Sequence, residues 1–145
     1  MPATNLDRRV ASRLSERDVR YTSGRQIVVK ALSEVDGPRS VAELSEIIGD
    51  SVPVSSLYRT LAVLEDAGVV APHFSKNLAR YELAEWLAGH HHHLVCVECG
   101  TIDDITMPSA LEERVEDIVT EIGSMTSFSA NNHALEVEGK CARCS

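Results

Sequence analysis

A chain of 145 residues with 43% hydrophobic residues has the size and composition of one or two small folded domains, which excludes a disordered or fibrous protein. Its net charge of −8 argues at first against nucleic acid as a partner, because DNA is itself a polyanion. There is no signal-peptide core and no apolar run near the roughly 20 residues that span a bilayer, so we expect a cytoplasmic protein that does not enter a membrane.

The charge is unevenly distributed. Residues 1–30 carry seven Arg or Lys and three acidic residues, so this end has a net charge of +4 and the rest of the chain −12. A basic end on an acidic body is compatible with DNA contact at that end, and equally with a solvated basic helix that has no partner.

The first region of the chain is predicted to be mostly helical. One helix is expected over about residues 22–34, with an apolar stripe along one side. A short second helix begins at a capping box formed by Ser40 and Glu43 and ends at Gly49. A third helix then spans about residues 54–67 and ends at Gly68.

In this third helix the leucines predict which side faces the core. Leu57, Leu61 and Leu64 recur at helical spacing and form one buried face. Ser55 and Arg59 then point outward, with Tyr58 on the flank. Two short helices joined by a turn, with such polar residues outward, are typical of a helix-turn-helix, although similar helix pairs also occur in proteins that never bind DNA.

A hairpin and a smaller α/β unit follow. Residues 69–74 and 79–83 read as a hairpin in the position of a wing, and the predicted domains are 1–84 and 85–145. Strands are expected at 94–97, 101–106 and 133–139. A helix from a second capping box, Ser109 with Glu112, to Gly123 lies between them. One side of this helix is apolar and consists of Leu111, Val115, Ile118, Val119 and Ile122.

Two C-x-x-C pairs, Cys96 with Cys99 and Cys141 with Cys144, provide four thiolates. Four thiolates satisfy tetrahedral zinc and leave no open position, so the pairs predict a structural zinc site that ties the C-terminus to the first strand of its domain. A redox dithiol and unmetallated core cysteines are the alternatives.

Four consecutive histidines, His90 to His93, precede a predicted strand. Alternation along a strand places His91 and His93 on one face and His90 and His92 on the other, which predicts two half-sites. Sites of His and carboxylate suit Fe(II), Mn(II), Co(II), Ni(II) or Zn(II) and bind reversibly. The alternative is a histidine-rich turn without function. The candidates to complete these sites are Asp66, Glu82, Asp103, Asp104, Glu112 and His133.

In order along residues 13–144, several motifs together resemble the ferric uptake regulator (Fur) family. They are Ser-Leu-Tyr-Arg-Thr-Leu from Ser56, Glu-Asp-Ala-Gly from Glu65, Arg-Tyr-Glu from Arg80, the run from His90 to Cys99, and the terminal cysteine pair. The resemblance implies an α+β fold, with a winged-helix DNA-binding domain and a small α/β dimerisation domain. It also implies a homodimeric repressor, not an enzyme, whose bound metal controls binding to pseudopalindromic operator DNA.

The resemblance also assigns residues. It implies DNA contacts by Arg20, Arg25, Ser55, Ser56, Tyr58, Arg59 and Thr60. It implies a regulatory metal site of Glu82, His91, His93 and Asp104. It implies a second site of His90, His92, Glu112 and His133, and structural zinc on Cys96, Cys99, Cys141 and Cys144.

The sensed metal stays open between Fe(II), Zn(II) and Mn(II). Many family members supply a histidine from the loop where this chain has Gly37-Pro38-Arg39, and the stretch after Glu82 is longer here, so Asp66 is an alternative ligand. Peroxide sensing through bound iron is a variant of the same function. A zinc-ribbon module that binds proteins is an alternative of another class, and no H-E-x-x-H motif supports a zinc hydrolase.

Overall fold

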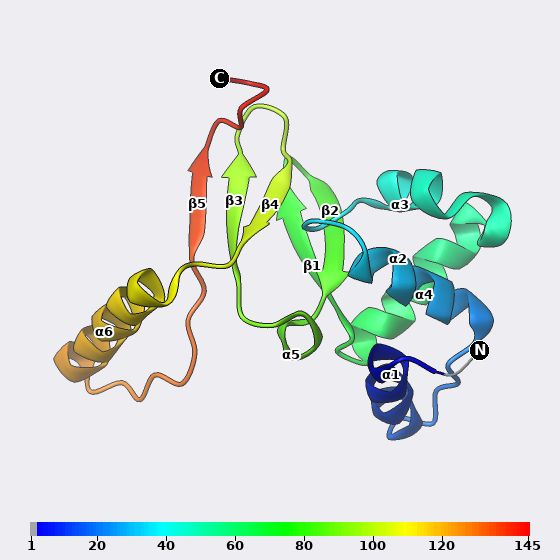
Figure 1. The fold of residues 1–145 in the computed structure, drawn as a ribbon, viewed down its shortest axis with the longest axis horizontal. Coiled ribbons are helices and arrows are strands. Elements are labelled where there is room, and N and C mark those ends of the chain that lie inside the picture. Colours follow the sequence, from blue (N-terminus) through cyan, green and yellow to red (C-terminus); the bar gives the residue numbers. More distant parts are fainter. Residues whose placement is uncertain (1–2) are drawn as a thin grey trace. The chain divides into compact units, whose positions relative to one another are not determined.

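The computed structural model describes residues 3–145 and divides into two units, Met1–His90 and His91–Ser145. The N-terminal unit contains α1 (Asn5–Ser15), α2 (Ser23–Ser33), α3 (Val41–Ile48), the short 3-10 helix η1 (Gly49–Ser51), α4 (Val54–Asp66), β1 (Val70–Ser75), β2 (Leu78–Leu83) and α5 (Glu85–Ala88). The C-terminal unit contains β3 (His92–Cys96), β4 (Ile102–Ile105), α6 (Ser109–Thr126) and β5 (Glu136–Gly139) (Figure 1). The α+β fold class expected from the sequence is confirmed.

The helices of the N-terminal unit form where local capping and apolar spacing agree. Ser40 and Glu43 make the predicted capping box at the start of α3, and Gly49 ends the helix. Gly68 follows α4 with φ of 73°, a left-handed conformation that glycine adopts without steric cost. The sequence reading overlooked α1, although Thr4 and Asp7 form a capping box of the same kind.

A single apolar core holds this unit together. Leu57, Leu61 and Leu64 of α4 are buried as predicted, and they pack in one cluster with buried residues of the other helices and of the hairpin. β1 and β2 pair antiparallel around a turn at Lys76 and Asn77, both with positive φ, which is the geometry of a tight hairpin turn. This hairpin is the predicted wing.

The short helix α5 is attached to the same unit through Trp86. The indole Nε1 of Trp86 donates a hydrogen bond of 2.7 Å to the carbonyl of Gly68, just beyond α4. The guanidinium of Arg13, from α1, stacks on the ring at 4.1 Å from its centroid, and Arg9 donates to the Trp86 carbonyl. The residues that follow the hairpin are therefore fixed to α1 and to the end of α4.

The C-terminal unit is a three-stranded sheet with one helix. Its strand order is β4-β3-β5, with β3 antiparallel to β4 and parallel to β5 (Figure 1). The central strand β3 begins in the histidine run and ends at Cys96, so the fold itself places both kinds of metal donor on one strand.

Two sequence expectations for α6 were wrong, the capping box at its start and the residue at its end. The N-cap is Pro108 and no side chain caps the helix, so Ser109 is its first residue and forms no capping box with Glu112. Both carboxylate oxygens of Glu112 instead contact histidines, as described below. The helix also continues past Gly123 to Thr126. Among residues 3–145, no helix combines the length and apolar composition needed to cross a bilayer.

Candidate metal sites and nucleic-acid interface

The outer face of α4 carries the residues expected to contact DNA. With the leucine face buried, Ser55, Tyr58 and Arg59 are exposed, and Ser56 and Thr60 are half-buried beside them. An Nη atom of Arg59 donates to the hydroxyl of Ser56 at 3.3 Å, one turn earlier in the helix. Tyr58 and Arg59 thus lie side by side on the exposed surface of a helix. An α-helix fits the major groove of DNA, where such side chains can reach the base edges.

Two further arginines lie before and within α2. Arg20 is exposed in the loop before the helix, and Arg25 is half-buried in its first turn. Arg25 donates a hydrogen bond to the Arg20 carbonyl, which fixes the backbone from which the Arg20 side chain projects.

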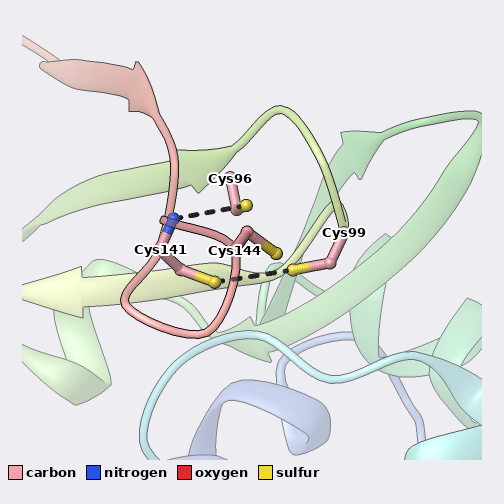
Figure 2. Close-up of side chains that lie close together, drawn as sticks. All are labelled: Cys96, Cys99, Cys141 and Cys144. Carbon is pink, nitrogen blue, oxygen red and sulfur yellow. Dashed lines mark hydrogen bonds between the residues drawn. The ribbon is translucent and has the colours of Figure 1, made fainter.

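The four cysteines converge in the C-terminal unit (Figure 2). Their sulfur atoms all lie within 4.8 Å of one another, and the Cys99 and Cys141 sulfurs are 3.8 Å apart. Cys96 ends β3, Cys99 lies in the turn that follows, and the other two cysteines follow β5. Because β5 runs parallel to β3, the second pair arrives at the same end of the sheet as the first.

Backbone groups prepare this cluster for a cation. Hydrogen bonds from the backbone of Cys99 and then Cys141 lower the pKa of the Cys96 thiol to about 6, and the Thr101 hydroxyl lowers the pKa of Cys99. The hydrogen bond with Cys141 is the main cause that raises the pKa of Cys144, to about 12. A metal that binds all four as thiolates therefore displaces protons, and its affinity rises with pH.

A group of His91, His93 and Asp104 occupies one face of the sheet. Asp104 is the partner of His93 in the β3–β4 register, and its oxygens lie 3.5 Å from His91 Nε2 and 3.3 Å from His93 Nε2. All three donor atoms lie within 4.8 Å of one another. The contact follows from the alternation of β3, which brings every second side chain to Asp104.

A second group, of His92, Glu112 and His133, includes a donor from α6. One Glu112 oxygen is 2.9 Å from His92 Nε2 and the other is 2.7 Å from His133 Nε2, while the two imidazoles stack with centroids 5.3 Å apart. His92 is almost completely buried. The carboxylate therefore contacts two imidazoles, and imidazole and carboxylate are both ligands that suit divalent metals.

Other predicted ligands have neighbours within the N-terminal unit. The Glu82 carboxylate, on β2, is buried and lies 2.8 Å from Nε2 of His73. His90 Nδ1 is 2.6 Å from the carboxylate of Glu85 in α5. Asp66 and Asp103 are exposed and belong to none of the donor groups found in residues 3–145.

The donor chemistry matches two kinds of metal. Four thiolates without a water position fit a structural zinc ion. Imidazoles with a carboxylate fit a divalent ion that binds reversibly. Sequence reasoning missed His73, because no local spacing relates it to Glu82; only the pairing of the two strands brings them together.

Comparison with known proteins places the chain among metal-dependent regulators. Residues 16–138 match the model of the ferric uptake regulator family. The ferric uptake regulation protein of Bacillus subtilis is 32% identical over 142 residues, which cover 94% of this chain and 92% of that protein.

Solved structures of ferric and manganese uptake regulators are also similar to this chain. The Vibrio cholerae ferric uptake regulator superposes with a TM-score of 0.68 at 27% identity, over 90% of this chain and 98% of that one. A zinc-bound manganese uptake regulator gives a TM-score of 0.67 at 27% identity, over 91% and 98%.

Proposed function

Because this chain belongs to the ferric uptake regulator family and is a metal-responsive transcriptional regulator, we propose that it is a repressor that binds pseudopalindromic operator DNA as a metal-loaded homodimer. The observation that carries the proposal is β3, which presents imidazoles to carboxylates on both of its faces in a chain that also contains a helix-turn-helix. Regulators of this family are not enzymes. The genes controlled are those of metal uptake or homeostasis.

In this proposal α4 reads the operator. Arg59 binds a guanine through two hydrogen bonds in the major groove, and the Tyr58 ring packs on a thymine methyl. The hydroxyls of Ser55, Ser56 and Thr60 hold the helix against the phosphates. Arg20 reaches the minor groove, and Arg25 contacts a phosphate.

In this proposal one metal stabilises the fold and another regulates DNA binding. Zinc on the four cysteines holds the C-terminal unit together. The regulatory ion, Fe(II), Zn(II) or Mn(II), is bound by His91, His93 and Asp104 with Glu82 from the hairpin. The second site consists of His92, Glu112 and His133, with His90 as its fourth ligand. Relatives are named for ferric and for manganese uptake, so the metal has to be determined by titration.

Exposed apolar side chains in the C-terminal unit support the dimer. Along α6, Leu111, Ile118 and Ile122 are 44%, 55% and 53% exposed, although their spacing is that of one continuous face. A face of this kind marks an interface, since soluble proteins rarely leave such a row in water. We place the DNA-binding domain in residues 1–84 and the dimerisation domain in residues 85–145.

Retardation of operator fragments at buffered free metal tests the function. We expect binding that disappears with chelator and returns with one metal of the set. Asp104→Ala should abolish the response to that metal, whereas Asp103→Ala, its exposed neighbour on β4, should keep it. A chain that folds, binds the metal and never retards operator DNA would leave a zinc-dependent protein-interaction module as its function.

A further inference from the structure

The segment between α1 and α2 holds Arg20 between two side chains that face inward. Val19 and Tyr21 both pack against the apolar core of the N-terminal unit, whereas Arg20 is exposed. The N–H of Val19 donates a hydrogen bond of 3.0 Å to the carbonyl of Leu14, in the last turn of α1. The backbone that leads into Arg20 is therefore fixed to α1.

Side chains from the first turn of α2 hold the next part of the backbone. A guanidinium nitrogen of Arg25 donates to the carbonyl of Arg20 at 2.5 Å. The side-chain amide of Gln26 donates to the carbonyl of Tyr21 at 3.0 Å. Both peptide groups that follow the Arg20 and Tyr21 side chains are thus anchored to α2.

The side chain of Tyr21 links this loop to the other end of α1. Its hydroxyl donates a hydrogen bond of 2.8 Å to Oδ1 of Asp7. The second oxygen of Asp7, Oδ2, accepts hydrogen bonds from the backbone N–H and the hydroxyl of Thr4, the N-cap of the helix. One carboxylate therefore joins the start of α1 to the loop that carries Arg20.

Both groups of this pair stay in the protonation state that the bond requires. Burial, with the hydrogen bond to Asp7, raises the pKa of Tyr21 well above its usual value, so the hydroxyl keeps its proton. Hydrogen bonds from Thr4 and then from Tyr21 lower the pKa of Asp7, so the carboxylate stays ionised. A hydrogen bond to a charged acceptor is stronger than one between neutral groups.

We propose that Tyr21 is a positioning residue for the minor-groove contact: through its hydrogen bond to Asp7 it holds the loop in the conformation from which Arg20 enters the groove. The proposal rests on the role of Arg20 in the function proposed above. A loop that is ordered before binding loses less conformational entropy when the complex forms, so the affinity for DNA is higher.

The charge of Asp7 distinguishes positioning from simple electrostatics. Removal of a carboxylate from the basic end of the chain should, by charge alone, strengthen binding to the polyanion DNA. Positioning predicts the opposite for Asp7, because loss of the acceptor releases Tyr21. Asp18 provides a control of equal charge. It is exposed in the same loop with φ of 57°, a conformation that asparagine tolerates.

The test measures the affinity of the full chain for a duplex that the wild type selects from random DNA in buffered Mn(II), or in Zn(II) if Mn(II) gives no binding. Tyr21→Phe loses only the hydroxyl and should weaken binding about two- to tenfold, the range for one hydrogen bond. Asp7→Ala should be weaker than the charge-matched Asp18→Asn by the same factor. Thr4→Ala removes the capping hydroxyl, keeps Asp7, and is the control for helix capping.

Two further measurements identify the route of the effect. In an Arg20→Ala background, Tyr21→Phe should change the affinity by less than about twofold, because the contact that it positions is already lost. In the free protein, Tyr21→Phe should speed hydrogen exchange over residues 16–22 and leave the protection of α4 unchanged.

Four results would overturn the inference. They are wild-type affinity of Tyr21→Phe, a loss that persists without Arg20, unchanged exchange in the loop, and equal weakening by Thr4→Ala and Asp7→Ala. If Tyr21→Phe does not fold, the comparison of Asp7→Ala with Asp18→Asn decides.

Failure of the inference and failure of the repressor function appear in different samples. The repressor function is tested with the wild type alone, and wild-type protein that never retards DNA refutes both the repressor and the positioning role. Metal-dependent retardation by the wild type, together with variants that bind equally well, leaves the repressor in place and removes only the role of Tyr21.

Discussion

The two units of this chain differ in what holds them together. The buried apolar cluster lies wholly in the N-terminal unit, between Val10 and Leu83. Among the described residues of the C-terminal unit, the buried hydrophobic side chains are those of Cys96 and Ile102, and the other buried side chain is that of His92. One unit is stabilised by the hydrophobic effect, and the other mainly by polar donors that a cation can bind.

In the proposed function, this difference separates the recognition of DNA from the sensing of metal. Burial of leucine and valine gives a stability that does not depend on solution metal, as a surface that reads DNA requires. In the function proposed above, a unit with so small an apolar core gains much of its stability from bound metal and from a second subunit, and both change with conditions. In the function proposed above, metal sensing therefore relies mainly on the unit whose own apolar core is smaller.

The largest effect should come from loss of the thiol cluster. Cys96→Ser should prevent zinc binding and unfold the C-terminal unit, because structural zinc contributes on the order of 10 kcal/mol to folding in small domains. Hydrogen exchange should show lost protection in β3 to β5 with α2 to α4 still protected. Ser129→Ala, at an exposed position outside the cysteine cluster, is the control. A zinc-free dimer that remains folded would refute the structural role.

A core substitution in the other unit should have the converse effect. Leu61→Ala should lower the free energy of unfolding of the N-terminal unit by about 2–5 kcal/mol, because it leaves a cavity in a packed core. Zinc content should not change. Urea denaturation with metal analysis measures both, and Ile47→Ala, at an exposed position of α3, is the control. Equal losses in the two variants would mean that the core is not packed as described.

Substitution on α6 should separate the subunits without unfolding the chain. Ile122→Glu places a charge in the proposed interface and should weaken the dimer by about 2–4 kcal/mol, the range of a central contact. Sedimentation at several concentrations measures the change. Glu121→Gln, the adjacent exposed residue, should leave the dimer intact. An unchanged dimer would place the interface elsewhere.

The smallest effect should be on DNA binding alone. Arg59→Ala should weaken operator binding by about 1–3 kcal/mol, through loss of two hydrogen bonds to one base, and leave the stability of both units unchanged. Binding to operator and to random fragments at one salt concentration provides the comparison. Equal weakening on both would show that Arg59 holds phosphate and does not read a base.

Local rules in the sequence predicted most of the fold. The spacing of Leu57, Leu61 and Leu64 identified the buried face of α4, and glycines marked the ends of α3 and α4. The same rules predicted a capping box with Ser109 as the N-cap. It does not form, because the N-cap is Pro108, Ser109 is already the first residue of the helix, and Glu112 contacts two histidines. A capping motif describes only the four residues it contains, whereas Glu112 also meets residues distant in the chain.

Two features of the sequence predicted parts of the candidate sites: the alternation of side chains along a strand and the two C-x-x-C pairs. Alternation along β3 accounts for the separate contacts of His91 and His92. The contact of His73 with Glu82 depends on the register of a hairpin, which spacing along the chain does not determine. Nor did any motif predict the packing of Trp86.

Trp86 is the only tryptophan in the chain. Its ring contacts an arginine of α1 and a carbonyl just beyond α4, so the tryptophan emission of the whole protein comes from the junction of α5 with these two helices. The chain thus contains its own optical probe at the contact of α5 with α1 and the end of α4. Intrinsic fluorescence during a metal titration would report on that junction without any added label.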